Sequence, residues 1–510
     1  MKKTLIAALA LSAAMALAPV GAMAQKSQDT LRIGVSDWFS VLDPIWFPLD
    51  EAGQFTRTVY ETLISYDERQ NRFVPRLAKS WTRVDPRTID FDLRDDVVFH
   101  NGDKFDADDV VYTFNYLIDP NVRMRFKERY DWMESVQKLG PYKVRVVSKR
   151  AFATDMQLLA YRMYLYDSKV HKAMEKKEDY GRGAPVATGP YKVVSMDAKG
   201  LVTERFDRYY DKSGNYPAPV KRVVALPMPD HQTQIAQFMT GGVDLLRNVP
   251  ADAARELARA PNAAVTSTHA GMLLYLTLDA QGRSGNKPMM DPRVREAFVK
   301  AIDRPTLAKT VIPGGDVAED MKGICFPSNI GCAPGNAPYA YDPAGAKRLL
   351  TEAGLPNGFD MELTTYTPIR EIGEAVAGQL RAVGIRASIQ PVPLNVWARV
   401  RAEGKMTAAI GIYPTSGQPD VGNMMDFFFT GDRDYWRDPI LVEAKEKGAV
   451  ETDDAKRTEI YKTALDRVNQ MAYILPLPEL PIVWVHTKDV KIADNPLSPL
   501  ETRLGDWAWK

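Results

Sequence analysis

The sequence predicts a large α/β protein with more than one domain. Its 510 residues, of which 45% are hydrophobic and 26% charged, are typical of globular proteins and suffice for roughly two to four domains. Segments with strand-like alternation are repeatedly followed by segments with helix-like spacing, which is the pattern of α/β folds. The 66 basic and 65 acidic residues nearly cancel and no long basic run occurs, so neither nucleic acid nor an anionic membrane surface is indicated as a partner.

The first 24 residues have the features of a secretory signal peptide. Lys2 and Lys3 precede an apolar run over residues 5–18, and Ala22-Met23-Ala24 supplies the small residues that a signal peptidase requires. The apolar run is too short to span a bilayer, and no later stretch is long and apolar enough. We therefore expect the mature chain to begin at Gln25 and to be a soluble periplasmic protein.

The most regular pattern lies between residues 73 and 118. Residues 88–93 alternate between polar and apolar, which predicts a half-buried strand. Asn101-Gly102 tolerates positive φ and predicts a tight turn. Asp106 is then predicted to cap a helix that ends before Pro120.

The following segments repeat this alternation of strands and helices. Gly189-Pro190 breaks the chain before a strand that begins at Tyr191, and a helix over residues 235–239 ends at Gly241-Gly242 before a strand at 243–246. A strand, helix, strand order of this kind predicts a mostly parallel sheet. Further elements are predicted at 31–35 (strand), 143–148 (strand), 371–383 (helix), 386–392 (strand), 395–403 (helix), 408–412 (strand) and 471–486 (a strand-rich return).

Two later helices are predicted from identical start signals. Asp291-Pro292 and Asp342-Pro343 each place a capping carboxylate before a proline at the first helical position. After Asp291 the apolar residues form one stripe, and after Asp342 the helix is predicted to end at Gly354. We assign these apolar stripes to the core.

Four segments together resemble one protein family. They are PRLAKSW followed by FDLRDDVVFHNGDKFDADDVVYTFN, PVATGPYKVVSMDAKGLVTERFDRYY, MMDPRVREAFVKAIDR and YAYDPAGAKRLLTEAGLPNGF. In this order they are similar to the extracellular solute-binding proteins of family 5, the dipeptide-, oligopeptide- and nickel-binding proteins of ABC importers. One departure is Ala187, which stands where the family usually has a glycine.

The resemblance implies a two-lobed periplasmic binding protein of type II (cluster C-like), with an extra α/β domain inserted in the first lobe. It places residues 25–58, 186–268 and 479–510 in lobe I, residues 59–185 in the extra domain and residues 269–478 in lobe II. Ligand binding would close the two lobes about the chain crossings between them, and the closed form would dock on an inner-membrane permease. We expect a monomer without a cofactor.

The resemblance also implies candidate ligand-binding residues. Trp38 and Trp46 flank the Leu42-Asp43-Pro44 loop, which lies at the mouth of the ligand cleft in the family, although a core role is the alternative. Arg370 precedes a helix in the region where dipeptide-binding relatives place a carboxylate-binding arginine, and surface solvation is its alternative. Trp397 is a further aromatic candidate.

The loop from Tyr413 to Asp420 resembles the stretch where peptide-binding members carry an aspartate for the ligand's α-amino group. Thr415 occupies that position here, and its hydroxyl lacks the charge that makes an ammonium contact strong. Tyr413 and Asp420 are candidate ligand residues beside it. Asp420 or Asp426 could compensate for the missing charge, or could serve only as a turn-former.

Cys325 and Cys332 are the only cysteines. Six residues separate them, including Pro327 and Gly331, and export exposes them to an oxidising compartment, so we expect a disulfide. Two free thiols are the alternative. A metal site is not indicated, because no histidine lies nearby in the sequence and because turn and cap roles account for His100, Asp103 and Asp106.

No enzyme motif is found. The sequence lacks G-x-S-x-G, G-x-x-x-x-G-K, H-E-x-x-H and C-x-x-C, and its five histidines are scattered, so we expect a binding protein and keep a secreted hydrolase as a remote alternative. The resemblance favours a peptide or peptide-like solute. Nickel complexes, opines and sugars are carried by relatives, and a periplasmic sensor or chaperone-like role would use the same fold.

Overall fold

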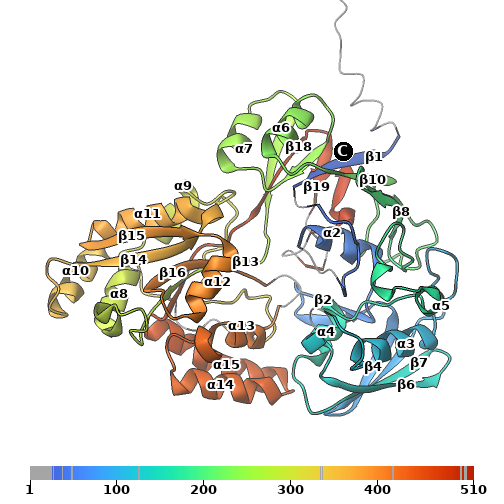
Figure 1. The fold of residues 1–510 in the computed structure, drawn as a ribbon, viewed down its shortest axis with the longest axis horizontal. Helices are drawn as coiled ribbons and strands as arrows, with labels where there is room; N and C mark the ends of the chain where they lie inside the picture. Colours follow the sequence, from blue (N-terminus) through green and yellow to red (C-terminus); the bar gives the residue numbers. More distant parts are fainter. Residues whose placement is uncertain are drawn as a thin grey trace, which may run out of the picture.

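The computed structural model describes residues 26–510 apart from positions 27, 37, 47–49, 125, 126, 334, 336, 416–418, 494, 496 and 499–501. The predicted signal peptide lies outside the described residues. Three sheet-based bodies are arranged around the centre of the molecule (Figure 1). The predicted fold class, two α/β lobes with an extra domain, is confirmed.

A seven-stranded sheet in the order β12-β18-β11-β1-β10-β9-β8 forms the first lobe. Its strands are β1 (Thr30–Val35), β8 (Tyr191–Asp197), β9 (Gly200–Arg205), β10 (Arg222–Pro227), β11 (Leu245–Arg247), β12 (Ala263–Thr268) and β18 (Ile482–Thr487). The accompanying helices are α2 (Asp50–Val59), α6 (His231–Met239) and α7 (Ala251–Leu257). After β18 the chain adds β19 (Val490–Ile492), the 3-10 helix η6 (Leu504–Asp506) and β20 (Trp507–Trp509).

The prediction of a mostly parallel sheet is wrong for this lobe. Only the two pairings of β1, with β10 and with β11, are parallel, and the other four pairings are antiparallel. β8 and β9 form a hairpin, and β18 returns from the other lobe to lie between β11 and β12 in the opposite direction. Local periodicity identifies strands but does not encode the direction in which a distant strand returns.

The extra domain contains a four-stranded antiparallel sheet in the order β4-β5-β7-β6. Its strands are β4 (Ala78–Asp85), β5 (Thr88–Leu93), β6 (Met133–Gly140) and β7 (Lys143–Ser148), and β2 (Ile64–Asp67) pairs separately with β3 (Arg72–Pro75). Its helices are α3 (Ala107–Ile118), α4 (Asp155–Tyr161), α5 (Ser168–Ala173) and the 3-10 helices η1 (Lys127–Arg129) and η2 (Lys177–Asp179).

The second lobe is built on a five-stranded sheet in the order β15-β14-β16-β13-β17. Its strands are β13 (Met272–Leu278), β14 (Phe359–Tyr366), β15 (Ile385–Val392), β16 (Ala408–Pro414) and β17 (Ile474–Pro476). Its helices are α8 (Pro292–Lys300), α9 (Arg304–Thr310), α10 (Pro343–Glu352), α11 (Arg370–Arg381), α12 (Leu394–Ala402), α13 (Val421–Phe428), α14 (Pro439–Val450), α15 (Asp454–Gln470) and the 3-10 helices η3 (Lys287–Met290), η4 (Thr367–Ile369) and η5 (Gly431–Arg433).

The predicted helix starts are confirmed. Asp106 accepts a hydrogen bond from the backbone of Asp108, within a reciprocal capping box, and α3 ends before Pro120. Asp291 accepts from the backbone of Arg293, and Asp342 from that of Gly345. Each carboxylate satisfies a backbone N–H that would otherwise have no partner at the helix start.

Gly189 lies where the extra domain joins the first lobe. Its backbone N–H donates to Val59 O at 2.9 Å, and a Cβ at this position would lie only 2.2 Å from Thr58 O. Only glycine allows two backbone segments to approach this closely. Gly189 is therefore required by the close packing of the chain where the extra domain joins the first lobe.

The hydrophobic cores show which bodies are packed together. One continuous core includes Ile33 of the seven-stranded sheet, Phe91 of the extra domain and Trp484 of β18. The second lobe has two cores of its own. The extra domain is thus packed firmly onto the first lobe, whereas the second lobe is a separate body.

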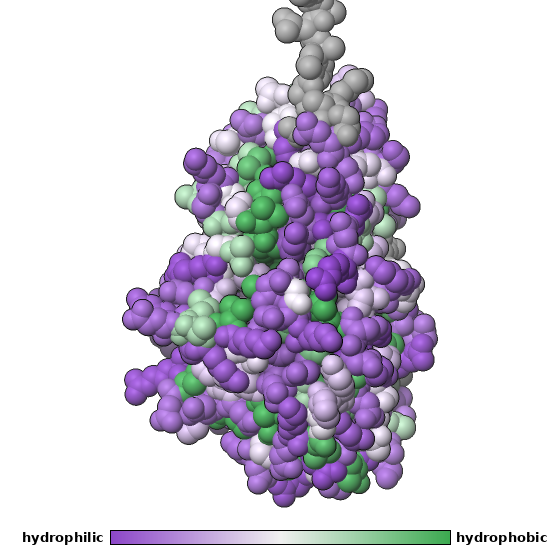
Figure 2. Space-filling model, turned by 90° about the vertical axis from the view of Figure 1, so that its right-hand side faces the viewer, coloured by the Kyte–Doolittle hydropathy of each residue, from purple (hydrophilic) through white to green (hydrophobic). Residues whose placement is uncertain are grey.

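The molecular face shown in Figure 2 is mostly hydrophilic, and its apolar areas are small and interrupted by polar side chains. Among the described residues, no helix has the length and apolar character needed to cross a membrane.

Candidate ligand-binding site between the lobes

Two chain crossings connect the first and second lobes. One joins β12 to β13 and the other joins β17 to β18. Glu479, which is fully buried in the second crossing, accepts hydrogen bonds from the backbone N–H groups of Ala270 (2.8 Å) and Gly271 (3.2 Å) in the first. His269 Nδ1 lies 2.7 Å from the same carboxylate. This carboxylate ties the two crossings together, which makes them one structural unit at the junction of the lobes.

Thr415, the predicted counterpart of an amine-binding aspartate, lies at this junction. Its backbone N–H and its Oγ1 both donate to Gly271 O, at 2.8 and 2.9 Å. The side chain is buried, and its hydroxyl proton is already used. A ligand could reach only the lone pairs of this oxygen.

Two predicted aromatic residues are brought together in the second lobe. Trp397 and Tyr413 are both buried and both belong to the core cluster around Tyr275 and Phe428. Burial raises the pKa of the Tyr413 hydroxyl, and neither this hydroxyl nor the Trp397 indole N–H has a hydrogen-bond partner among the described residues.

Trp38 and Trp46 lie in the first lobe, where they pack against its core. Trp38 stacks on Phe39 with ring centroids 5.1 Å apart. Asp43 shapes their loop: its carboxylate accepts from the backbone N–H groups of Ile45 and Trp46 and from the Tyr166 hydroxyl. Burial raises the pKa of Asp43 to about 6 despite these bonds.

Asp420 is paired with Arg457. Two hydrogen bonds of 2.7 and 2.6 Å join the carboxylate to the guanidinium, and both side chains are 1% exposed. Burial alone would lower the pKa of Arg457, but Asp420 raises it above its ordinary value. Asp420 also caps α13. Its charge is therefore neutralised within the second lobe, and sequence reasoning missed the partner because it lies 37 positions away.

Arg370 is at the surface of α11. Its side chain is 61% exposed and is hydrogen-bonded to Glu374, one helical turn further along, at 2.7 Å. Asp426, the other residue considered for an amine contact, is exposed, although desolvation of its carboxylate by the surrounding protein raises its pKa. No described group of three or more His, Cys, Asp or Glu side chains is arranged to hold a metal.

The predicted disulfide is present. Cys325 and Cys332 are bonded, with their Cα atoms 6.0 Å apart. Within the loop that they close, Ile330 forms a β-bridge with Asp420, donating to Pro419 O at 2.6 Å and accepting from Val421 N–H at 3.0 Å. The disulfide therefore supports the segment that carries Asp420.

The structure identifies one residue that the sequence reasoning missed, Arg162. It follows α4 directly, its Nε is buried, and neither an ion pair nor a side-chain hydrogen bond to it is found among the described residues. Burial, together with the nearby charges of Arg129 and Arg57, lowers the pKa of Arg162 to about 10. Its charge partly opposes the rise in the pKa of Tyr413, so it lies within electrostatic reach of the second lobe.

A guanidinium whose Nε is shielded from water without a hydrogen-bond partner is energetically unfavourable unless an acceptor joins it. A carboxylate is the best match, because it accepts two parallel N–H bonds. The sequence does contain a signal for this residue: Arg162 is the only charged residue in the apolar run LLAYRMYLY, residues 158–166.

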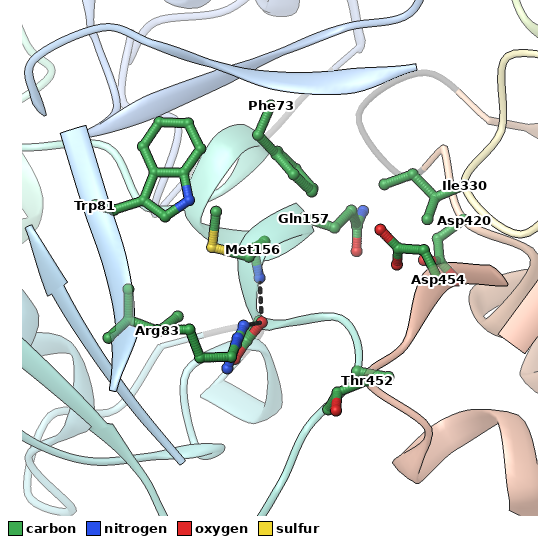
Figure 3. A pocket seen from close by; sticks show the side chains of 12 residues that line it. Phe73, Trp81, Arg83, Met156, Gln157, Ile330, Asp420, Thr452 and Asp454 are labelled. Atoms are coloured by element: carbon green, nitrogen blue, oxygen red, sulfur yellow. Dashed lines mark hydrogen bonds and ion pairs between the residues drawn. The ribbon is translucent and has the colours of Figure 1, made fainter. Parts of the chain in front are cut away.

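A cavity of about 260 Å³ lies between the extra domain and the second lobe (Figure 3). The extra domain contributes Phe73, Trp81, Arg83, Ile89, Ala153, Asp155, Met156 and Gln157, and the second lobe contributes Ile330, Asp420, Thr452 and Asp454. α4 supplies Asp155, Met156 and Gln157 and ends next to Arg162. Residues of the cavity therefore lie on α4, and Arg162 is the residue that directly follows this helix.

Comparison with known proteins agrees with this architecture. Residues 72–436 match the family model of bacterial extracellular solute-binding proteins, family 5 Middle. The glutathione-binding protein GsiB of Escherichia coli strain K12 is 25% identical over 511 aligned positions, covering 94% of each chain.

Solved structures show the same fold. NikA from Brucella suis, in complex with Fe(III)-EDTA, superposes with a TM-score of 0.79 at 23% identity, covering 94% of this chain and 100% of that one. The periplasmic binding protein DppA from Helicobacter pylori, in complex with the peptide STSA, gives 0.71 at 21% identity, with 95% and 99% covered. The family match, which spans most of the chain, shows that this protein belongs to the bacterial extracellular solute-binding proteins of family 5.

Proposed function

We propose that this protein is the periplasmic solute-binding component of an ABC importer and that its solute is a short peptide or peptide-like molecule with a free carboxylate. Membership of the solute-binding family supports the transport role. The relatives described above include a glutathione-binding protein and a structure with a bound peptide, and both of those ligands carry carboxylates. The protein would release its solute chemically unchanged.

Arg162 is the observation that carries the choice of solute. Its side chain is half-buried, its Nε is buried without a hydrogen-bond partner, and its charge acts on Tyr413 of the opposite lobe. A carboxylate between the lobes would accept its hydrogen bonds and would balance its positive charge. The aromatic side chains Tyr413, Trp397, Trp38 and Trp46 would then cover the rest of the solute from both lobes.

We further propose that the domains divide at residues 58/59, 185/186, 268/269 and 478/479. The chain crossings tied by Glu479 coincide with the last two of these boundaries. Because the extra domain shares its core with the first lobe, closure would move the second lobe as a single body. A solute that touches both lobes would favour the closed state, which would dock as a monomer on the permease.

A binding assay on matched variants tests the proposal. The mature protein is screened by thermal shift against di-, tri- and tetrapeptides and glutathione, and the best probe is then titrated by calorimetry. A ligand at a hundred times its dissociation constant stabilises its protein by about 2.7 kcal/mol. Arg162→Gln is compared with Arg150→Gln, which removes the same charge from an exposed position in the same domain.

We expect Arg162→Gln to bind the probe at least about tenfold more weakly, because one charge-assisted pair contributes roughly 1.5–3 kcal/mol. Arg150→Gln should bind like the wild type, and amidation of the probe's carboxylate should remove the difference between the variants. Equal affinity of Arg162→Gln and wild type would refute the role of Arg162. A wild type that responds to no peptide would refute the solute class.

A further inference from the structure

The cavity between the extra domain and the second lobe, which we call the α4 cavity, contains polar atoms without partners. Asp155 is 1% exposed, and its Oδ1 accepts from Arg83 at 2.8 Å and from the backbone of Met156 at 2.6 Å, whereas its Oδ2 has no hydrogen-bond partner among the described residues. Gln157 is equally buried, and its Nε2 also lacks a partner. One acceptor and one donor thus remain unsatisfied in the cavity wall.

The side chain of Gln157 is only half satisfied by hydrogen bonds. Gln157 Oε1 does have a partner, Asn423 Nδ2 of the second lobe at 3.4 Å, so the amide is held in place across the interface with its donor side unused. In Figure 3, Gln157 and the carboxylate of Asp454 face each other across the cavity from the two bodies. The space of about 260 Å³ far exceeds the roughly 10–15 Å³ that one water molecule needs.

The charges around the cavity do not balance. Arg83 pairs with Asp155, and Arg457 pairs with Asp420. Asp454 has no ion-pair or side-chain hydrogen-bond partner among the described residues, although the charges of Arg457 and Arg83 act on its carboxylate. Two cations therefore face three carboxylates, and the surplus is one negative charge.

The apolar part of the wall favours a cation further. Trp81 and Phe73 present aromatic rings beside Met156 and Ile330 (Figure 3). Aromatic faces attract ammonium groups, and the interaction is strongest where water is excluded. The cavity thus combines an unused carboxylate oxygen, a surplus negative charge and aromatic surface, which suit an ammonium group, with an amide donor that suits a carbonyl.

We propose that the α4 cavity binds a primary ammonium group together with the carbonyl next to it, as found at the amino end of a peptide. This inference rests on the proposed function, because it assigns the opposite end of the same solute. The ammonium would donate to Asp155 Oδ2 and lie beside Asp454, the carbonyl would accept from Gln157 Nε2, and the first side chain would pack on the aromatic rings.

The spacing along α4 sets the length of such a solute. Gln157 of α4 and Arg162, which follows the helix, are five residues apart, about 7.5 Å along the helix axis and about 140° around it. An extended peptide covers about 3.3–3.6 Å per residue, and both side chains add reach. A peptide of roughly two to four residues would connect the cavity with Arg162.

Leucinamide is the probe that tests the cavity by itself, because it carries an ammonium, a carbonyl and an aliphatic side chain but no carboxylate for Arg162. N-acetyl-leucinamide is the matched probe without the charge. Both are titrated by ligand-observed NMR into the full mature protein, into Asp454→Asn and into Glu459→Gln. The last variant is the control, since Glu459 is an exposed carboxylate on the same helix, α15.

We expect leucinamide to bind the wild type and Glu459→Gln equally, and to bind Asp454→Asn several-fold to tenfold more weakly. N-acetyl-leucinamide should bind all three proteins equally weakly. Leucinamide binding that is absent, or that is unchanged in Asp454→Asn, would overturn the inference. Neither result bears on the carboxylate site, because Arg162→Gln tests that site separately with whole peptides.

Discussion

Arg162 and Arg457 are two arginines at the interface between the extra domain and the second lobe, and their surroundings are opposite. Arg457 is fully buried with a bidentate carboxylate, a backbone carbonyl and a tyrosine hydroxyl as acceptors. Arg162 has no side-chain acceptor among the described residues, and two further arginines are near it. Accordingly the pKa of Arg457 is raised and that of Arg162 is lowered to about 10. The first arrangement is complete without a ligand, and the second is the one that we propose a ligand completes.

The largest effect is expected from removing the satisfied arginine. Arg457→Met would leave Asp420 buried without its counter-charge, which typically costs about 3–5 kcal/mol. Urea unfolding followed by circular dichroism measures the loss of stability. The double variant Asp420→Asn/Arg457→Met should recover part of it, because no charge is then stranded. A loss below about 1 kcal/mol in the single variant would show that the pair is not structural.

A buried histidine in the extra domain should show what burial does to a group that can give up its charge. His171 stacks on Tyr166, and burial lowers its pKa from 6.5 to about 4. Between these values the unfolded chain binds the proton and the folded chain does not, so stability falls as the pH drops from 6.5 to 4. At about 1.4 kcal/mol per pH unit, the contribution is on the order of 3 kcal/mol.

His171→Phe keeps a stacking ring but does not titrate. Its unfolding free energy should therefore fall less steeply than that of the wild type between pH 6.5 and 4. His100, whose pKa burial also lowers to about 4, and Asp43, whose pKa burial raises to about 6, titrate equally in both proteins. Parallel pH profiles of the two proteins would contradict the assignment of a neutral, buried His171.

Opening the disulfide should destabilise the segment around Asp420 and Arg457 without affecting the surroundings of Arg162. The bond closes a short loop, and in the chain-entropy model its loss costs about 2–3 kcal/mol. Because Ile330 of this loop bridges to Asp420, the double variant Cys325→Ser/Cys332→Ser should also show faster amide exchange near residue 420. Dithiothreitol should destabilise the wild type and not the variant, and equal effects on both would contradict this account.

The smallest change in stability is expected from removing the unsatisfied arginine. Arg162→Met should unfold within roughly 0.5 kcal/mol of the wild type, since the relief of an uncompensated charge offsets the lost packing. Its solute affinity should nevertheless fall by about tenfold or more. If Arg162→Met were as destabilised as Arg457→Met, the contrast between the two arginines would not hold.

Local features of this fold were predictable from the sequence because they depend on neighbouring residues. The caps at Asp106, Asp291 and Asp342 follow from the residue types at the helix starts, and the disulfide follows from two cysteines close together in an exported chain. The antiparallel insertion of β18 was not predictable in this way, because it depends on contacts that span more than two hundred positions.

The candidate site was harder to predict for the same reason. The pairing of Asp420 with Arg457 and the bond from Thr415 to Gly271 are tertiary contacts, and neither has a local pattern. The apolar run around Arg162 marks this residue in the sequence, but its lack of a side-chain partner among the described residues is visible only in the structure. The roles of Trp38, Trp46, Arg370, Trp397 and Tyr413 toward a solute stay predictions.

A crystal structure of the mature protein with a bound peptide, selected from the thermal-shift screen, tests the central claim most directly. We predict that the peptide carboxylate accepts two hydrogen bonds of about 2.7–2.9 Å from the Arg162 guanidinium and that residues of both lobes enclose the solute. A peptide bound with its carboxylate elsewhere, and with the Arg162 guanidinium still unpartnered, would contradict it.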